Sequence, residues 1–245
     1  MKRLFLLCAV IGLCHFDVFC QKKYEMVIEK TNGEEVVINT EDIVRTYFRE
    51  RNGGNTPDSH VEGLTAVDLG LPSGTKWANI NVGAGDAKPL GGYYSWGEIN
   101  EKTSYYWKDY LYGSSMDDVV NIGTDISGTE FDVAHKLLGG SWVMPTLADM
   151  RELLENCTFQ WTVQENQKGG LFTSKRNGNS VFFPAGGLWW NGSLHETNKS
   201  GNYWSSTLDS EVPGWAVTLY FDEDGPEITD PAPRCDGNSI RPVCH

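Results

Sequence analysis

The chain has 245 residues and carries 33 acidic against 20 basic side chains, a formal net charge of −13. No basic block occurs in it, so the composition argues against nucleic acid, an anionic membrane or a sulfated polysaccharide as partners. Hydrophobic residues make up 40% of the chain, which also has 27 glycines and 10 prolines. This composition predicts a globular protein with a sizeable core, many turns and few long helices.

Residues 1–20 have the pattern of a secretory signal peptide. A basic start at Lys2 and Arg3 precedes an apolar run over 4–13, and a cleavage site lies before Gln21. The apolar run is too short to span a bilayer, so we expect no transmembrane segment in the mature chain. The predicted location is exported, either secreted or associated with the outer-membrane surface. A lipoprotein is the alternative, although the cysteines available for acylation each follow a large apolar residue: Cys8, Cys14 and Cys20.

Residues 21–50 are expected to form an N-terminal β-hairpin segment. Two alternating runs, 24–29 and 34–38, flank Asn32-Gly33, which is a strong two-residue hairpin signal. Because an isolated hairpin is marginally stable in water, we expect this segment to pack on the main domain or on a partner. The polar, Gly-containing stretch 51–61 has the composition of a linker.

Two helices in the remainder of the chain have clear start signals. Thr129 and Asp132 precede one apolar helical face, and Thr146 and Asp149 precede another, so both pairs are interpreted as capping boxes. A polar segment without clear period, 99–128, is expected to be a long loop. The predicted strands are two within 67–78 and one each at 92–96, 171–173, 180–184, 203–206, 215–221 and 239–243. These elements predict an α+β domain, a twisted antiparallel sheet with two short helices and long loops.

Two segments carry a family resemblance. The first is GGSWVMPTLADMRELLENC at 139–157, and the second runs from Trp204-Ser205-Ser206 to Arg241-Pro242-Val243. Together they resemble the Fibrobacter succinogenes major paralogous domain family of Bacteroidetes, which is related to Lcl-type adhesin C-terminal domains and to the C-type-lectin-like and formylglycine-generating-enzyme folds. The resemblance covers residues 62–245. It implies a C-type-lectin-like domain that binds ligands on irregular loops, with catalysis only as a specialisation.

The resemblance also implies where a ligand binds. In relatives the ligand face lies between the Trp-Ser-Ser and Arg-Pro-Val segments, which corresponds here to loops 207–215 and 222–238. These loops are acidic, which favours a cationic protein patch or a neutral glycan. Trp189 and Trp190 lie on an extended Gly-rich segment, where neighbours point in opposite directions, so one of them is expected to be an exposed anchor; burial of both is the alternative. The predicted ligand-binding residues are Trp189, Trp190, Asp209, Glu211, Asp222, Glu223 and Asp224.

Three cysteines follow residue 20. Cys235 and Cys244 flank a turn at 236–238 and are predicted to form a structural disulfide, which for so short a loop contributes about 2.5–3 kcal/mol. The alternative, implied by the formylglycine-generating enzymes, is that this pair binds copper. Cys157 closes the second helix on its apolar face and is expected to be a buried free thiol.

Sequence motifs for catalysis are missing. The chain has no HExxH, GxSxG or P-loop motif, and no histidine has an obvious nucleophile beside it, so we expect no enzyme activity, cofactor or metal site. Calcium binding by the acidic run 222–230 stays open, although the spacing is not that of an EF-hand. We predict an exported cell-surface protein, adhesin-like or lectin-like, that binds a glycan or protein ligand. The alternatives are a structural subunit of a surface assembly, such as a fimbrial tip, and a copper-dependent oxidase.

Overall fold

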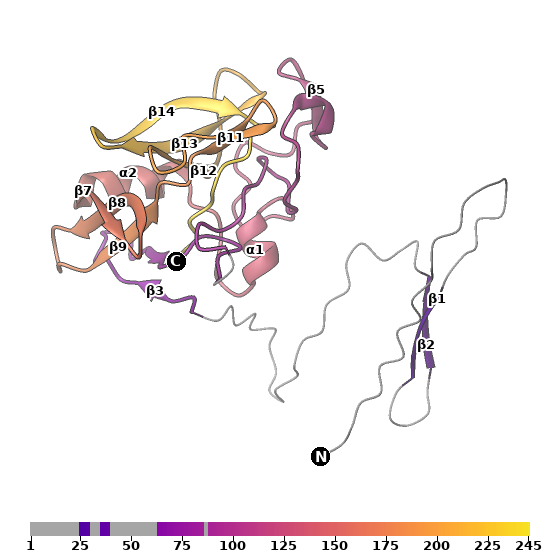
Figure 1. Ribbon diagram of the computed structural model, residues 1–245, viewed down its shortest axis with the longest axis horizontal. Helices are drawn as coiled ribbons and strands as arrows, with labels where there is room; N and C mark the ends of the chain where they lie inside the picture. Colours follow the sequence, from indigo (N-terminus) through magenta and orange to yellow (C-terminus); the bar gives the residue numbers. More distant parts are fainter. Residues whose placement is uncertain (1–24, 30–34, 40–62, 86–87) are drawn as a thin grey trace. The chain divides into compact units, whose positions relative to one another are not determined.

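The structure is a computed structural model (Figure 1), and it describes residues 25–29, 35–39, 63–85 and 88–245. Contacts divide the chain into two units, 1–55 and 56–245, and each is described by itself. In the first unit, β1 (Glu25–Glu29) and β2 (Glu35–Asn39) pair in antiparallel register. The predicted signal peptide with its three cysteines, the predicted Asn32-Gly33 turn and the predicted linker lie outside the described residues.

The second unit is an α+β domain of antiparallel sheets with two helices. One sheet is a meander of β7 (Cys157–Gln164), β8 (Gln167–Ser174) and β9 (Ser180–Pro184). Another consists of β12 (Gly201–Leu208), β13 (Trp215–Asp222) and β14 (Gly225–Pro233). A third joins β15 (Val243–Cys244), β4 (Lys76–Ala78) and β3 (Ala66–Val67). Two small hairpins are β5–β6 (Gly113–Ser115, Asp118–Val119) and β10–β11 (Leu188–Trp190, Ser193–His195).

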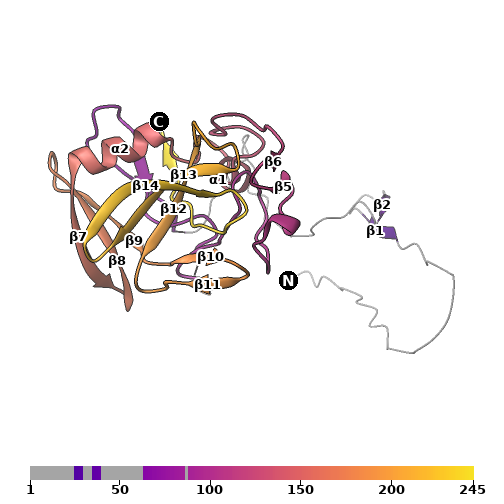
Figure 2. The ribbon, with the colours of Figure 1, turned by 90° about the horizontal axis from the view of Figure 1, so that it is seen from above.

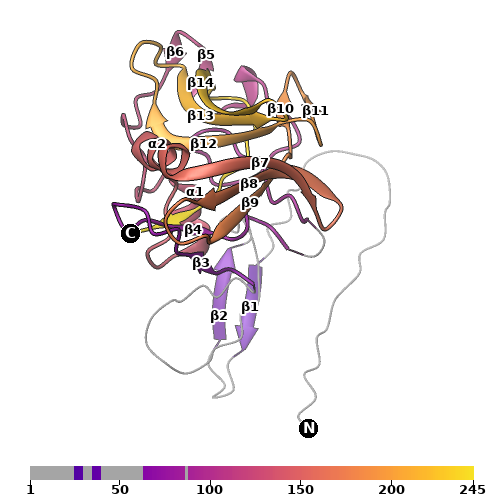
Figure 3. The same cartoon turned by 90° about the vertical axis from the view of Figure 1, so that its left-hand side faces the viewer.

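The β7–β9 sheet and the long insertion occupy different sides of the domain. Helix α2 (Leu147–Asn156) contacts β7 and all three strands of the β12–β14 sheet, as Figure 3 shows. Hairpin β10–β11 lies beside β12 (Figure 2). A parallel β-bridge between Gly187 and Gly201 joins the two at that point. The predicted loop 99–128 contains a short 3₁₀ helix at Trp107–Asp109 and hairpin β5–β6, on the side of the domain away from β7–β9.

Several strands differ from the sequence prediction. The predicted strands at 92–96 and 239–243 reduce to isolated bridges plus the short β15. Strand β7 was not predicted, although its sequence CTFQWTVQ alternates strictly between polar and apolar residues. Strand β14 was assigned to a polar loop because its three prolines are unfavourable in a central strand; as the edge of its sheet it tolerates them.

The two helices begin at short polar side chains. At α2 the Thr146 hydroxyl accepts from the Asp149 N–H while the Asp149 carboxylate accepts from the Thr146 N–H, which confirms the predicted capping box. At α1 (Val133–Leu138) the cap is Asp132 and not Thr129, since Asp132 accepts from His135 N at 3.0 Å. The Thr129 hydroxyl instead donates to a turn carbonyl, Ile126 O.

Two clusters of buried hydrophobic residues fill the domain. In the larger one, the rings of Phe172, Phe183 and Phe221 lie 5.0–6.4 Å apart between α2, β8, β9 and β13. In the second, Trp96 and Trp204 are fully buried, and both indole N–H groups donate to backbone carbonyls. Each large side chain contributes about 2–3 kcal/mol by leaving water, so these clusters fix the scaffold on which the loops sit.

Residues 234–238, which follow β14, are buried, which corrects the assignment of this part of loop 222–238 to an exposed ligand surface. Arg234 lies 4.8 Å from the centre of the Trp96 ring and donates to Tyr110 Oη at 2.8 Å. Arg241 lies over the Phe183 ring and donates to the Asn81 side chain and to two backbone carbonyls. Both guanidinium groups are almost fully buried, so residues 234–241 hold the core together and cannot form a free binding surface.

Candidate functional site

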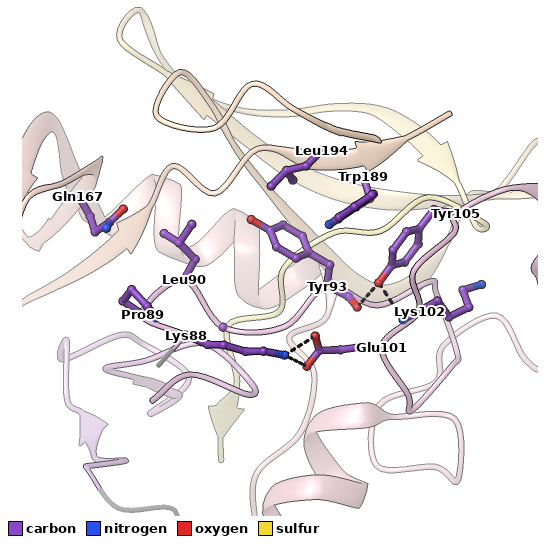
Figure 4. A pocket seen from close by; sticks show the side chains of 11 residues that line it. Lys88, Pro89, Leu90, Tyr93, Glu101, Lys102, Tyr105, Gln167, Trp189 and Leu194 are labelled. Atoms are coloured by element: carbon purple, nitrogen blue, oxygen red, sulfur yellow. Dashed lines mark hydrogen bonds and ion pairs between the residues drawn. The ribbon is translucent and has the colours of Figure 1, made fainter. Parts of the chain in front are cut away.

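A pocket of about 350 Å³ opens on the second unit, within the size range of small-molecule sites. Three segments form its walls: the loop 88–93, residues 101–105 of the insertion, and hairpin β10–β11. Gln167, at the start of β8, lies at its outer end (Figure 4). The segments are far apart in sequence, so the pocket exists only in the folded domain.

The hairpin β10–β11 places one face on the pocket. Asn191 and Gly192, with φ of 48° and 73°, form its two-residue turn, and both lie in the left-handed region that a type I′ turn requires. Trp189 pairs directly with Leu194 across the hairpin, so the two side chains share a face, and both line the pocket. Trp190 therefore points the other way and is 50% exposed.

The backbone of Trp189 is bonded to the segment that follows β14. Its N–H and C=O exchange hydrogen bonds with Gly237 at 2.8 and 2.9 Å, and its ring centre lies 5.5 Å from that of Tyr105. A Cβ on Gly237 would lie 2.5 Å from the Tyr105 ring and 2.9 Å from Trp189 Cβ. Only glycine therefore allows this backbone to approach the two rings.

The loop 88–93 turns sharply to bring Leu90 and Tyr93 into the pocket. Gly91 has φ of +82°, and a Cβ there would lie 2.7 Å from the Val82 carbonyl oxygen, so glycine is required. Tyr93 is anchored by its hydroxyl, which donates to Gly186 O at 2.6 Å. The turn thus presents the Tyr93 ring to the cavity and keeps the hydroxyl engaged.

Tyr105 is fixed in the same way. Its hydroxyl donates to Tyr93 O at 2.7 Å and accepts from Lys102 N at 3.2 Å. Burial raises the pKa of Tyr105 to about 12 and raises the pKa of Tyr93 further, so both phenols stay neutral. The aromatic wall of the pocket is therefore uncharged and rigid.

Charged groups at the pocket are paired with each other. Lys88 Nζ contacts both carboxylate oxygens of Glu101 at 2.8 and 3.0 Å. Lys102 Nζ lies 2.9 Å from the buried carboxylate of Glu98 and also donates to Asp109 O at 3.1 Å. Each cation has an adjacent anion, so the pocket carries no net charge from these four side chains.

The structure separates the predicted acidic ligand residues. Asp209 and Glu211 lie in the loop between β12 and β13, where the Asp209 carboxylate accepts from two backbone N–H groups of its own turn. Asp222 is the last residue of β13, at its opposite end, and Glu223 and Asp224 form the turn before β14. The length of β13 puts roughly 23 Å between the two groups. They do not form one face, and of the seven predicted ligand residues Trp189 is the one that lines the pocket.

The described cysteines are free thiols, so the predicted Cys235–Cys244 bridge is not formed. Cys235 is buried with its sulfur 3.8 Å from the Asp236 carboxylate, whereas Cys244 lies in β15 opposite Lys76. Burial raises the pKa of Cys235 to about 12 and that of Cys157 to about 11, which disfavours the reactive thiolate. Among the described residues no cluster of three or more His, Cys, Asp or Glu is placed to hold a metal ion.

One histidine does have a hydroxyl beside it, contrary to expectation. Ser193 Oγ lies 2.8 Å from His195 Nε2, on the hairpin face that points away from the pocket. The same nitrogen lies 3.1 Å from the carbonyl oxygen of Trp190, which can only accept a hydrogen bond. In the tautomer that carries the proton on Nε2, this nitrogen donates to the carbonyl and cannot take a proton from Ser193.

Sequence reasoning missed Leu90, Tyr93, Tyr105 and Leu194 as pocket residues. Two local signals were available: the glycine pair at 91–92 and the Asn191-Gly192 turn between apolar residues. Comparison of the chain with protein-family models, with curated proteins and with solved structures found no match. The site is therefore interpreted from its own geometry.

Proposed function

We propose that the protein is an exported, cell-surface binding protein, adhesin-like or lectin-like, without catalytic activity. The pocket between loop 88–93, residues 101–105 and hairpin β10–β11 is its ligand site. The observation that carries the proposal is the fixed aromatic wall of Tyr93, Tyr105 and Trp189. A rigid apolar cavity with a few polar groups at its edge is the usual form of a binding site.

The chemistry of the pocket favours binding over catalysis. No histidine, cysteine or serine is among the described residues that line it. The two carboxylates beside it, Glu98 and Glu101, are each held by a lysine. A general base needs a free carboxylate or imidazole within reach of its substrate, and these groups are occupied.

The proposed fold is the C-type-lectin-like one. Support comes from the antiparallel sheets with two short helices, and from the long insertion between β4 and α1. The proposed export follows from the signal-peptide pattern of residues 1–20. In the part of the chain that the structure describes, no helix is long and apolar enough to cross a membrane.

A structural subunit of a surface assembly is the second candidate. Three apolar side chains of the insertion are exposed: Leu111 at 71%, Val120 at 56% and Met116 at 38%. A contiguous exposed apolar patch is typical of a protein interface, and these are the side chains of the insertion that would contribute to one. If this function is the correct one, the chain associates through the insertion and the pocket is incidental.

A ligand-observed NMR screen tests the proposed function. The full chain, produced with export so that any processing takes place, is screened against a library of small sugars, nucleosides, amino acids and short peptides. We expect binders whose signal is lost in Trp189→Ala and kept in the matched variant Trp190→Ala. The absence of binders, or binders indifferent to Trp189→Ala, would remove the pocket as the ligand site.

A further inference from the structure

We propose that the ligand of the pocket is a neutral sugar, bound with the apolar face of its pyranose ring against Trp189 and its hydroxyl groups toward Lys88 and Glu101. This assignment rests on the proposed function, since it gives a ligand class to the same pocket. It uses neither calcium nor the acidic turns at the ends of β13.

The pocket has an apolar side that matches the C–H face of a pyranose. Trp189 and Leu194 project from the same face of the hairpin. Tyr93 and Tyr105, at 9% and 2% exposure and with their hydroxyls engaged by backbone groups, form the floor that supports these two side chains. An aromatic ring attracts the weakly positive C–H groups of a sugar through its negative face, as it attracts other positive edges.

The opposite side of the pocket is polar. Figure 4 shows Lys88 and Glu101 across the cavity from Trp189 and Leu194, with Tyr93 between the two sides. An ammonium group has three donors and a carboxylate has about four acceptor positions, so this ion pair keeps capacity for further bonds. A sugar hydroxyl both donates and accepts, and can therefore bind such a pair without separating its charges.

Charge disfavours the other ligand classes. Both lysines at the pocket are paired with glutamates at 2.8 and 2.9 Å, so an anionic or cationic ligand would place its charge beside a like charge of a pair. The net charge of −13 further repels phosphorylated ligands. A neutral molecule with one apolar face and one hydroxyl-rich edge satisfies both sides of the cavity.

The test is calorimetric titration of the full exported chain with a panel of defined probes. Methyl glycosides of glucose, galactose, mannose and N-acetylglucosamine represent neutral sugars, glucuronate and glucosamine the charged ones, and adenosine and a proline-rich peptide the other classes. We expect at least one neutral glycoside to bind, with an affinity independent of salt. Trp189→Ala and Glu101→Gln should each weaken it about tenfold, whereas Trp190→Ala should leave it unchanged.

Trp189→Phe keeps a stacking ring and should retain most of the affinity, which separates stacking from a fault in folding. Near-ultraviolet circular dichroism checks that every variant is folded. If Trp189→Ala does not fold, Glu101→Gln provides the test. Binding of adenosine or the peptide in place of glycosides, with loss in Trp189→Ala, would overturn the sugar assignment and leave the pocket as the ligand site. Glycoside binding that neither variant weakens, or no binding by any probe, would overturn the assignment and the proposed function together.

Discussion

The pocket and the acidic turns at the ends of β13 show two ways in which polar residues gather. At the pocket, side chains from three distant segments converge, and backbone hydrogen bonds fix them before any ligand arrives. At the turns, the carboxylates of Asp209 and Asp222 accept from N–H groups of their own turns, and both residues are half-buried. In this chain, the acidic runs of the sequence form local turns. The pocket, by contrast, is formed by side chains from segments that are far apart in the sequence.

A third kind of carboxylate, buried in the domain, is that of Asp236, the neighbour of Gly237 in the sequence. Asp236 is 4% exposed, and burial raises its pKa to about 7. Its folded pKa exceeds the unfolded value, so the protonated form is favoured by folding. The stability it contributes is full below about pH 4 and is lost as the pH rises toward 7.

The pKa of Asp236 gives the largest predicted effect, which is on the pH dependence of the free energy of unfolding. Between pH 4 and 7 the wild type should lose stability relative to Asp236→Asn by about 1.4 kcal/mol per pH unit. Above pH 7 the difference should level off. Melting curves of both proteins from pH 4 to 8 measure it, and a difference independent of pH would contradict the account of Asp236.

The close approach of Gly237 to the pocket rings gives a second prediction. Gly237→Val should push Trp189 and Tyr105 apart, abolish ligand binding and cost roughly 1–3 kcal/mol of stability. Gly85→Ala is the matched control, because a Cβ there meets nothing within 4 Å. It should change stability by less than about 0.5 kcal/mol. Urea unfolding and titration together measure both effects; retained binding in Gly237→Val would show that the ring pair is not needed.

The capping box of α2 gives an intermediate effect that leaves the pocket untouched. Thr146→Ala removes one partner of the reciprocal bonds with Asp149 and should cost about 1 kcal/mol. Thr129→Ala at α1 should cost less, because Asp132 is the cap there. Chemical denaturation measures the two losses. A larger loss for Thr129→Ala would contradict the assignment of the cap.

The smallest effect is expected at the acidic turn. Simultaneous replacement of Asp222, Glu223 and Asp224 by Ala should change stability by about 1 kcal/mol or less. Glu223 and Asp224 are exposed, and the half-buried Asp222 loses only its bonds from Tyr220 Oη and Asp224 N. It should leave affinity for the pocket ligand unchanged. A marked loss of affinity in a folded triple variant would return the site to the turn that sequence reasoning favoured.

The sequence predicted those parts of the fold that depend on neighbours in the chain. The α2 capping box is such a case, since Thr146 and Asp149 lie within one turn. At α1, both Thr129 and Asp132 are residue types that can cap the helix. The cap is Asp132, whose carboxylate also accepts from Met144 N. That contact joins residues twelve positions apart, and no local pattern reveals it.

The site was less predictable because its parts are non-local. The sequence marked Trp189 and Trp190 together and predicted that the exposed one is the anchor. The exposed one is Trp190, whereas the half-buried Trp189 lines the pocket. Tyr93 and Tyr105 carry no local mark of a pocket. A buried arginine misleads in the same way: charged residues are normally exposed, and Arg234 fell within the predicted ligand loop 222–238, although it is buried, as Arg241 is. Their cation–aromatic contacts become visible only when Trp96 and Phe183 are in place.

The most direct test of the central claim is an NMR map of ligand-induced chemical-shift changes on the ¹⁵N-labelled chain. Trp189→Phe assigns the Trp189 indole signal, and Trp190→Phe assigns its neighbour. We predict that a bound neutral glycoside shifts the Trp189 indole signal and the backbone signals of 88–93 and 101–105, while Trp190 and 222–224 stay unchanged. Shifts confined to 209–211 or 222–224 would contradict the pocket as the site of binding.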